Sequence, residues 1–429
     1  MTSRSLWNGF ADMAQVQRTG MLSLDRGEGV HVWDVQGRRY LDATAGLWFA
    51  NVGHGRECIA QAAAAQMTRL AAYSGFGDLT TPVATELAAR LAGIAPMAQA
   101  SVFFTNGGSD GVDTAVKLLL RTWTLRGQPQ RRIFLSREHG YHGMHLAGTA
   151  LAGIPSNRDG YGVAPIETEV VAWDSVEALR KAVGRLGAER IAGFFCEPVI
   201  GAGGVHPAPE GYLRGVRQVC GEAGIPFIAD EVITGYGRIG GAWFASSRFG
   251  LEPDLVLTAK GLTSGYAPMG AVLVSPELAE PFFAGKAGAF RHGYTYGGHA
   301  AAAAAALRNL ELLENEHLVD GAARLEKDLA EAFAPVADLA VVRSVRSGTG
   351  ALAAVELGDP ALATAALSGL REAGVLTRVI GGTALQVSPA LTMTKGEVGD
   401  LAGAFTQVLT ALGSGDTPGG GDLDGTAVR

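Results

Sequence analysis

The sequence predicts an α/β fold, in which a large, mostly parallel β-sheet is accompanied by a smaller α+β unit. Three observations support this prediction. From about residue 60 onward, short apolar runs alternate with alanine-rich segments, which is typical of a parallel sheet covered by helices. Residues 29–46 alternate apolar and polar side chains around a Gln-Gly turn, as in a hairpin with one exposed face. After residue 300, helical segments lead into further strand-like runs.

The elements of the large sheet can be assigned in chain order. Apolar segments rich in β-branched and aromatic residues predict strands within 101–105, 131–136, 191–199, 225–232, 254–260 and 270–274. The alanine run at residues 300–306 is followed by Arg308 and Asn309, so it predicts a packed helix and not a membrane span. Residues 341–357, 374–381 and 383–394 supply the strands of the smaller unit. Residues 415–429 are rich in Gly and Asp and are expected to be disordered.

Composition excludes several classes of function. The 429 residues carry 35 Lys+Arg against 42 Asp+Glu, so the chain lacks the basic character of a nucleic-acid binder. Cys58, Cys196 and Cys220 are too few and too widely spaced for a disulfide framework or a cysteine-based zinc site. The N-terminus has no apolar segment of the secretory type, and no run is long enough to span a membrane. We therefore expect a cytoplasmic protein with small-molecule partners.

A glycine-rich turn follows the first predicted strand of the large sheet. Gly107, Gly108 and Ser109 stand between the strand 101–105 and a helical segment. Backbone N–H groups and a hydroxyl at a helix N-terminus favour a phosphate. An ordinary tight turn between a strand and a helix would have the same appearance, so the turn alone leaves both interpretations open.

The same turn also matches a serine hydrolase nucleophile motif. Residues 107–111 read G-x-S-x-G, which would make Ser109 the nucleophile. Asp230 followed by His292 or His299 would complete a triad in the required chain order. Many chains of this length meet that order by chance.

Two further patterns are weaker. Residues 235–240 match G-x-G-x-x-G, but Asp230 and Glu231 separate the glycines from the strand, which argues against a dinucleotide site. His139, His142 and His145 have the spacing H-x-x-H-x-x-H, yet the intervening glycines argue against one helix that would align the rings on a metal. We interpret the three histidines as a loop cluster and predict no metal site.

Two apolar strands end in charged residues. Asp230 lies at the carboxyl end of the segment 225–232, and Lys260 lies at the same end of the next predicted strand. A buried ion pair would explain both residues but would add little stability. Ligands of open α/β sheets bind outside the carboxyl ends of the strands, where the glycine turn also lies. A phosphate cradle, an acid and a lysine are together what pyridoxal 5'-phosphate (PLP) requires.

The chain resembles a known family, the class III aminotransferases of the omega-amino acid:pyruvate group. The resemblance rests on DATAGLWFANVGHG, FFTNGGSDGVDTAVKL, REHGYHG, CEPVIGAGGV, IADEVITGYGRIG, TAKGLTSGYAPMG and HGYTYGGHAAAAAAL, which occur in the family's order between about residues 7 and 410. It implies PLP fold type I. It also implies a division into residues 1–55 and 306–414, which form the small domain from both chain ends, and residues 56–305, which form the large PLP-binding domain.

The resemblance implies a role for each matching residue. Lys260 would form the Schiff base with PLP, and Asp230 would pair with the ring nitrogen. Val232 and Tyr141 would flank the ring, the turn at residues 107–109 would bind the phosphate, and Thr295 would reach the phosphate of a neighbouring subunit. His142 and Glu197 complete the cofactor residues that it implies, and Trp48, Phe76, Tyr141, Ala202 and Arg378 are the implied substrate residues. The partners would be an amine donor and a keto acid, in a homodimer or a dimer of dimers with shared active sites.

Two departures from the family pattern affect what the resemblance implies. The family commonly reads N-S-G-S-E where this chain has Asn106-Gly107-Gly108-Ser109-Asp110, so one hydroxyl contact to phosphate is lost while the backbone donors remain. Val232 stands where related decarboxylases carry glutamine, which favours transamination over decarboxylation. The expected activity is a ping-pong transamination through PLP and pyridoxamine phosphate. The alternatives are a serine hydrolase that uses Ser109, a related PLP enzyme such as a decarboxylase or an aminomutase, and a non-catalytic protein that retains the scaffold of the PLP enzymes.

Overall fold

A seven-stranded sheet organises the larger half of the molecule. The computed structural model describes residues 5–162, 164–285 and 287–414, so the tail predicted to be disordered lies outside the described residues. In spatial order the strands are β4 (Ser101–Thr105), β12 (Gly270–Val274), β11 (Leu255–Thr258), β10 (Phe227–Asp230), β7 (Ile191–Cys196), β5 (Ile133–Arg137) and β6 (Thr168–Val171). Only β12 runs antiparallel to its neighbours in this sheet. The prediction of a mostly parallel sheet is confirmed.

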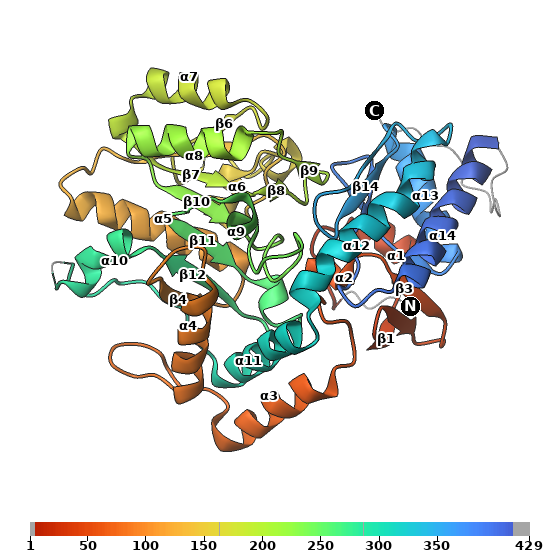
Figure 1. Cartoon of the computed structure of the whole chain (residues 1–429), viewed down its shortest axis with the longest axis horizontal. Helices are drawn as coiled ribbons and strands as arrows, with labels where there is room; N and C mark the ends of the chain where they lie inside the picture. The colour runs from red at the N-terminus through yellow and green to blue at the C-terminus, as the bar shows by residue number, and fades with distance from the viewer. Residues whose placement is uncertain (1–4, 163, 286, 415–429) are drawn as a thin grey trace.

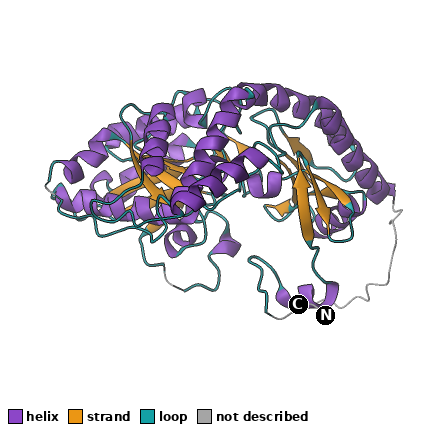
Figure 2. Ribbon diagram, turned by 90° about the horizontal axis from the view of Figure 1, so that it is seen from below, coloured by secondary structure: helices purple, strands orange, loops and turns teal. Residues whose placement is uncertain are grey.

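Helices cover both faces of this sheet (Figures 1 and 2). One face packs against α5 (Gly108–Leu125), α6 (Leu146–Leu151) and α10 (Pro276–Phe283), and the other against α7 (Val176–Leu186) and α8 (Tyr212–Ala223). Helix α5 buries Val112, Val116, Leu119 and Trp123, which recur at helical spacing. Successive residues of each strand point to opposite faces of the sheet and pack against different layers of helices. The strands are therefore apolar on both faces.

The two ends of the chain come together in the smaller half. Strands β1 (Leu24–Glu28), β2 (His31–Asp34) and β3 (Arg39–Asp42) form a meander, and β15 (Val375–Leu376) pairs parallel with β3. A second sheet has the order β13 (Ser344–Arg346), β14 (Ala353–Glu356), β17 (Ala384–Val387) and β16 (Val379–Ile380). Strands β8 (Val199–Ile200) and β9 (His206–Pro207) form a separate pair. Further helices are α1 (Met13–Thr19), α2 (Ala45–Trp48), α9 (Ala245–Phe249), α13 (Pro360–Glu372) and α14 (Lys395–Ser414).

The alanine run forms the buried start of a helix, as the sequence predicts. Helix α11 (Ala300–Asn315) packs against α3 (Glu57–Leu70) and α4 (Pro82–Ile94). Among the described residues, no helix is both long enough and apolar enough to cross a membrane. The domain boundary predicted after residue 305 falls inside α11, and the division into domains stays a prediction.

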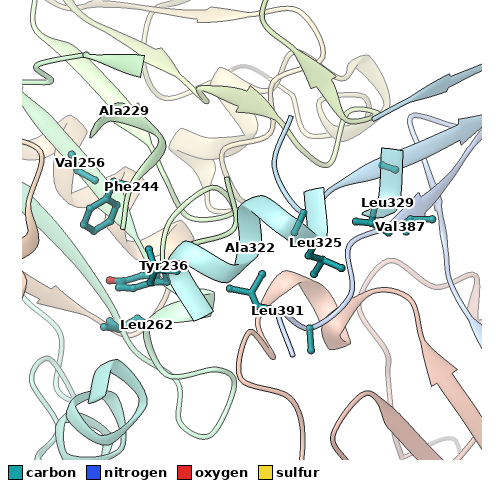
Figure 3. Packing of buried hydrophobic residues seen from close by; sticks show 14 of the residues in the cluster. Ala229, Tyr236, Phe244, Val256, Leu262, Ala322, Leu325, Leu329, Val387 and Leu391 are labelled. Carbon is teal, nitrogen blue, oxygen red and sulfur yellow. The ribbon is translucent and has the colours of Figure 1, made fainter. Parts of the chain in front are cut away.

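The core continues from one half into the other through α12 (Leu318–Phe333). Figure 3 shows Tyr236 and Leu262 on one side of Ala322, and Leu391 and Val387 on its other side. The glycine-rich segment 235–240 lies here as a series of turns and opens no helix, which agrees with the argument against a dinucleotide site. Its glycines allow close packing, because a Cβ on Gly237 would approach the Cα of Val319 to 3.0 Å.

Within that segment, Arg238 is fully buried and joins three distant parts of the chain. Its guanidinium donates to the carbonyl oxygens of Ala351 at 3.1 Å and Pro389 at 2.6 Å, and to Asn51 Oδ1 at 2.8 Å. Burial lowers the pKa of Arg238 to about 9. The smaller half is thus attached to the larger one by a buried cation that has no carboxylate within bonding distance among the described residues.

We expect Arg238→Ala to lower the free energy of unfolding by about 2–4 kcal/mol. The change leaves three buried acceptors without a donor, and this loss is partly offset because a buried charge is removed. Urea denaturation measures the effect. The exposed Arg69 offers a control, since Arg69→Ala should change stability by less than about 0.5 kcal/mol. Equal losses in both variants would contradict the structural role of Arg238.

Candidate active site

A cavity of about 450 Å³ opens at the carboxyl ends of the parallel strands. Every cofactor residue that the sequence analysis named, except Thr295, lines it: Gly107, Gly108, Ser109, Tyr141, His142, Glu197, Asp230, Val232 and Lys260. These residues lie at or just after the carboxyl ends of β4, β5, β7, β10 and β11, which all end at this edge. The cavity therefore gathers side chains that are up to about 150 residues apart in sequence.

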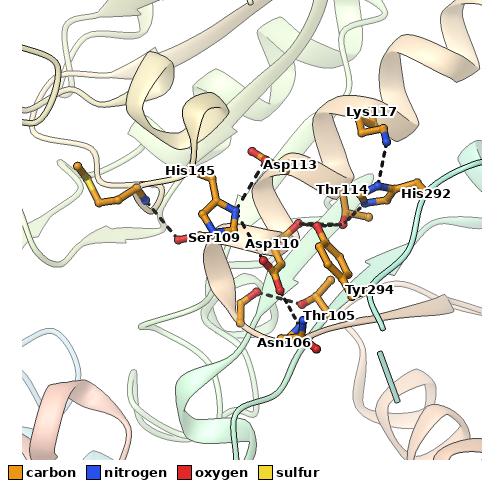
Figure 4. A network of polar contacts seen from close by, with 12 residues as sticks. Thr105, Asn106, Ser109, Asp110, Asp113, Thr114, Lys117, His145, His292 and Tyr294 are labelled. Carbon is orange, nitrogen blue, oxygen red and sulfur yellow. Dashed lines mark hydrogen bonds and ion pairs between the residues drawn. The ribbon is translucent and has the colours of Figure 1, made fainter. Parts of the chain in front are cut away.

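The glycine turn forms one wall of the cavity. Helix α5 begins at Gly108, and Gly107 precedes it in an extended conformation with φ 179°. A Cβ on Gly107 would meet no atom within 4 Å, whereas one on Gly108 would approach Val232 Cγ1 to 3.0 Å. Ser109 Oγ accepts a hydrogen bond from the N–H of Met144 at 3.2 Å (Figure 4). Open space beside the first N–H groups of a long helix suits an anion such as phosphate.

Asp230 is buried and held in position. Its Oδ2 lies 2.7 Å from His142 Nδ1, and its Oδ1 accepts from the N–H of Val232 at 3.2 Å. Because His142 is itself buried, the imidazole orients the carboxylate without exposing it to solvent. A fixed, desolvated carboxylate can hold a proton on a heteroaromatic nitrogen.

Lys260 lies just beyond the end of β11 and lines the same cavity as this carboxylate. Its φ is +40°, in the left-handed region that a residue with a side chain seldom adopts, so the surrounding structure enforces this conformation. Burial lowers the pKa of Lys260 to about 8, although the charges of Asp230 and Glu197 act to raise it. A substantial fraction of this amine is therefore neutral, and nucleophilic, near pH 8.

Glu197 fixes the loop that carries Tyr141. Its Oε1 accepts from the N–H of Tyr141 at 2.9 Å, and its Oε2 accepts from the N–H of Gly201 at 3.0 Å. Burial raises the pKa of Glu197. Arg137, which was not predicted from the sequence, is fully buried and donates to the carbonyl oxygen of Glu197. The signal in the sequence that could have indicated Arg137 is a charged residue at the end of the apolar strand 133–137.

A second cavity, of about 1140 Å³, shares Tyr141, Ile233 and Lys260 with the first. Three of the predicted substrate residues also line it: Trp48, Ala202 and Arg378. The guanidinium carbon of Arg378 lies 4.3 Å from the ring centre of Trp48, and its Nε donates to Gln386 Oε1 at 2.7 Å. Burial lowers the pKa of Arg378 to about 10, so it remains a cation at neutral pH. Gln386 was not predicted from the sequence.

Phe76 and Thr295 lie away from Lys260 in the single chain. Phe76 is 54% exposed and lines a separate cavity together with His292 and Tyr294, and Thr295 is exposed nearby. Neither residue lines the two cavities around Lys260. Their roles in substrate and phosphate binding therefore stay predictions.

The residues proposed for a hydrolase triad have other partners. His292 contacts Thr114 Oγ1 through Nε2 at 2.8 Å and Lys117 Nζ through Nδ1 at 3.0 Å, as Figure 4 shows. His299 caps its own helix by accepting from the N–H of Ala302 at 3.4 Å. Asp230 pairs with His142. Nothing in the described residues supports the serine hydrolase alternative.

The three spaced histidines do not converge. His142 contacts Asp230, whereas His145 Nδ1 lies 3.6 Å from Asp110 Oδ1. The ring of His139 instead lies 4.8 Å, centre to centre, from that of His206. Each histidine thus serves a different contact, as expected for a loop cluster.

Comparison with known proteins decides the family. The family profile described as Aminotransferase class-III matches residues 13–409. The chain belongs to the class III aminotransferases. It is 36% identical to the putrescine–pyruvate aminotransferase of Pseudomonas aeruginosa, over 91% of each chain. It is also similar to a solved omega transaminase from Pseudomonas jessenii in complex with pyridoxamine phosphate, with 34% identity, a TM-score of 0.91 and coverage of 96% of this chain and 98% of that one. A solved transaminase from Virgibacillus is 35% identical, with a TM-score of 0.92 and coverage of 96% and 98%.

Class III aminotransferases depend on PLP, and the residues of this aminotransferase suit that cofactor. The space beside Gly107 at the start of α5 can receive a phosphate, and the buried Asp230 can hold a protonated ring nitrogen. Lys260 combines a low pKa with a position in the same cavity. These three groups therefore match the phosphate, the ring nitrogen and the aldehyde of PLP.

The contrast between Gly107 and Gly108 provides a test of the phosphate cradle. Gly107→Ser should leave the stability of the apoprotein within about 0.5 kcal/mol, because its Cβ meets no protein atom, yet strengthen PLP binding by about 0.5–1.5 kcal/mol, because it restores the hydroxyl that the family commonly carries at this position. Gly108→Ala should destabilise the apoprotein itself by about 1–3 kcal/mol, since it collides with Val232. Thermal denaturation and PLP titration of the apoprotein measure the two effects.

The double variant Gly108→Ala/Val232→Ala serves as the control, because the smaller side chain removes the collision. It should recover most of the lost stability. Unchanged PLP affinity in Gly107→Ser would count against this turn as the phosphate site.

Proposed function

We propose that this aminotransferase transfers an amino group from an amine or omega-amino acid to a keto acid such as pyruvate, in a ping-pong reaction. The observation that carries the proposal is that Lys260 lines two adjoining cavities. The first is also lined by Asp230, and the second by Arg378. A similar protein of Pseudomonas aeruginosa is named for putrescine and pyruvate, which supports the same pair of substrate classes. A cytoplasmic location stays a prediction.

The residues that would hold PLP are divided between its parts. The turn at residues 107–109 would hold the phosphate, Asp230 the ring nitrogen and Lys260 the aldehyde carbon, while Val232 and Tyr141 would flank the ring. When bound, PLP supplies an electron sink that stabilises negative charge on the substrate carbon. His142 and Glu197 would act by orienting Asp230 and Tyr141, as their hydrogen bonds indicate.

Lys260 would move the proton in both half-reactions. Its amine, with a pKa of about 8, is basic enough to accept a proton at Nζ and acidic enough to return it. Asp230 would meanwhile keep the ring nitrogen protonated, since its own orientation is fixed by His142. Val232 in place of glutamine favours transamination over decarboxylation, and we propose no decarboxylase or aminomutase activity.

Arg378 would bind the carboxylate of the keto acid. Its guanidinium presents a planar array of donors that matches a carboxylate, and it lines the same cavity as Trp48, Tyr141 and Ala202. Donors without a carboxylate would occupy the apolar part of the cavity, which Trp48 and Ile233 line. One cavity would thereby accept two chemically different substrates in turn.

The active site would be completed by a second subunit. Phe76 lies against the loop 292–298, which contains Thr295, and both residues are exposed, so that a partner chain could reach them. His292 and Tyr294 hold this loop against Thr114 of α5. The proposed assembly is a homodimer, or a dimer of dimers, in which each subunit supplies Thr295 to the phosphate site of the other.

Absorbance tests the proposed reaction directly. The holoenzyme should lose its visible PLP band when an amine donor is added and recover it with pyruvate. Lys260→Ala should stop this cycle, with a loss of at least about 10²–10⁴-fold, because the proton-transferring amine is gone. Borohydride reduction of the wild type should attach PLP to Lys260, and attachment to a different lysine would refute the assignment.

Mixing of subunits tests the shared site. Thr295→Ala should weaken PLP retention by roughly 1.5–3 kcal/mol, the usual effect of losing a hydrogen bond to a charged group. In heterodimers with Lys260→Ala subunits, the weakened site should be the one in the Lys260→Ala subunit, because its phosphate would face residue 295 of the Thr295→Ala chain, which lacks the hydroxyl. Active monomers in sedimentation would contradict the shared site.

A further inference from the structure

The guanidinium of Arg378 is held on two sides and open on a third. One face lies on the ring of Trp48, and Nε donates to Gln386 Oε1. Within the described residues, Arg378 makes no ion pair, and no other hydrogen bond of its guanidinium is formed. Its two terminal nitrogens are therefore the donors that remain for a ligand in the cavity.

Gln386 is rigidly placed for this contact. It is fully buried in β17, and its backbone N–H donates to the carbonyl oxygen of Arg378 at 3.0 Å. Its side-chain amide also donates to Ser388 Oγ, which fixes the amide so that Oε1 faces Arg378. Ser388 is anchored in turn, because its N–H donates to the carbonyl oxygen of Ala43 at 2.7 Å. The guanidinium is thus tied through two side chains to the N-terminal segment that carries Trp48.

The neutrality of Gln386 matters as much as its position. An amide oxygen accepts from Nε without cancelling the charge of the guanidinium. Nearby, Arg346 shows the alternative arrangement, in which Nη2 lies 3.2 Å from the carboxylate of Glu356. Arg378 keeps its full charge for a ligand, whereas Arg346 is paired within the protein.

We propose that Gln386 is a positioning residue that determines specificity for carboxylate substrates. By occupying Nε, it leaves carboxylates to bind end-on, through both terminal nitrogens of Arg378, and excludes the side-on mode that uses Nε. By fixing the guanidinium before the substrate arrives, it lowers the entropy that is lost on binding. This inference rests on the proposed role of Arg378 as the carboxylate-binding residue.

The test compares two acceptors of the pyridoxamine form of the holoenzyme. In Gln386→Met, a variant of similar length without the acceptor, KM for pyruvate should rise about 5–10-fold, as expected for the loss of one hydrogen bond of about 1 kcal/mol. The limiting rate with pyruvate, and both constants with a carboxylate-free acceptor such as butanal, should change less than twofold. Parallel losses with pyruvate and butanal would reduce Gln386 to a structural role.

Gln386→Glu separates position from charge. It keeps an acceptor for Nε but adds a negative charge that pairs with Arg378, so KM for pyruvate should rise at least as much as in Gln386→Met. A KM equal to that of the wild type would overturn the argument from neutrality. If Gln386→Met fails to fold, Ser388→Ala provides a second variant, because it frees the amide of Gln386 while retaining its oxygen. It should raise KM for pyruvate by a smaller factor, and an unchanged value would count against the proposal.

An Arg378→Ala background distinguishes the two proposals. If Arg378→Ala leaves KM for pyruvate unchanged, the proposed role of Arg378 itself is wrong. If Arg378→Ala raises it and Gln386→Met does not, only the inference about Gln386 fails. Adding Gln386→Met to Arg378→Ala should cause no further rise, since Gln386 acts through Arg378. A further rise would show that it acts by another route.

Discussion

The common direction of β4, β5, β7, β10 and β11 is the constraint on which the active site depends. Parallel strands return through helical crossovers, so their carboxyl ends all lie at one edge of the sheet. Each of these ends delivers one component: the glycine turn, Tyr141 and His142, Glu197, Asp230, and Lys260. The two helical layers that cover the sheet make this edge rigid. No single loop could hold these groups within one cavity.

Burial gives these groups their chemical character, and hydrogen bonds prevent burial from destabilising them. Asp230 is only 4% exposed, yet His142 and the N–H of Val232 satisfy its two oxygens. The same desolvation lowers the pKa of Lys260 to about 8, which an exposed lysine would not reach. A carboxylate that is oriented in advance and an amine that is partly neutral are therefore consequences of one dry cavity.

The smaller half of the chain carries the residues that we propose select carboxylate substrates. Arg378 follows β15, and Gln386 lies in β17, so the substrate end of the site is built from residues far along the chain from Lys260. Arg238 attaches that half to the larger one by donating to the carbonyl oxygens of Ala351 and Pro389. The distance between the cofactor residues and Arg378 is consequently fixed by buried polar contacts as well as by apolar packing. This separation allows the substrate end to change without alteration of the cofactor residues.

The sequence by itself determined the sheet, the glycine turn and the two charged strand ends, because strand composition and chain order are local properties that the topology of a parallel sheet converts into neighbours. It also carried the family resemblance, and with it Lys260 and Asp230. Only the tertiary structure decided that Asp230 pairs with His142 and not with His292 or His299, and that Gln386 holds Arg378. It also left Phe76 and Thr295 on the surface of the single chain. These outcomes depend on contacts between segments distant in sequence, and no local pattern specifies which of several suitable partners lies within bonding distance.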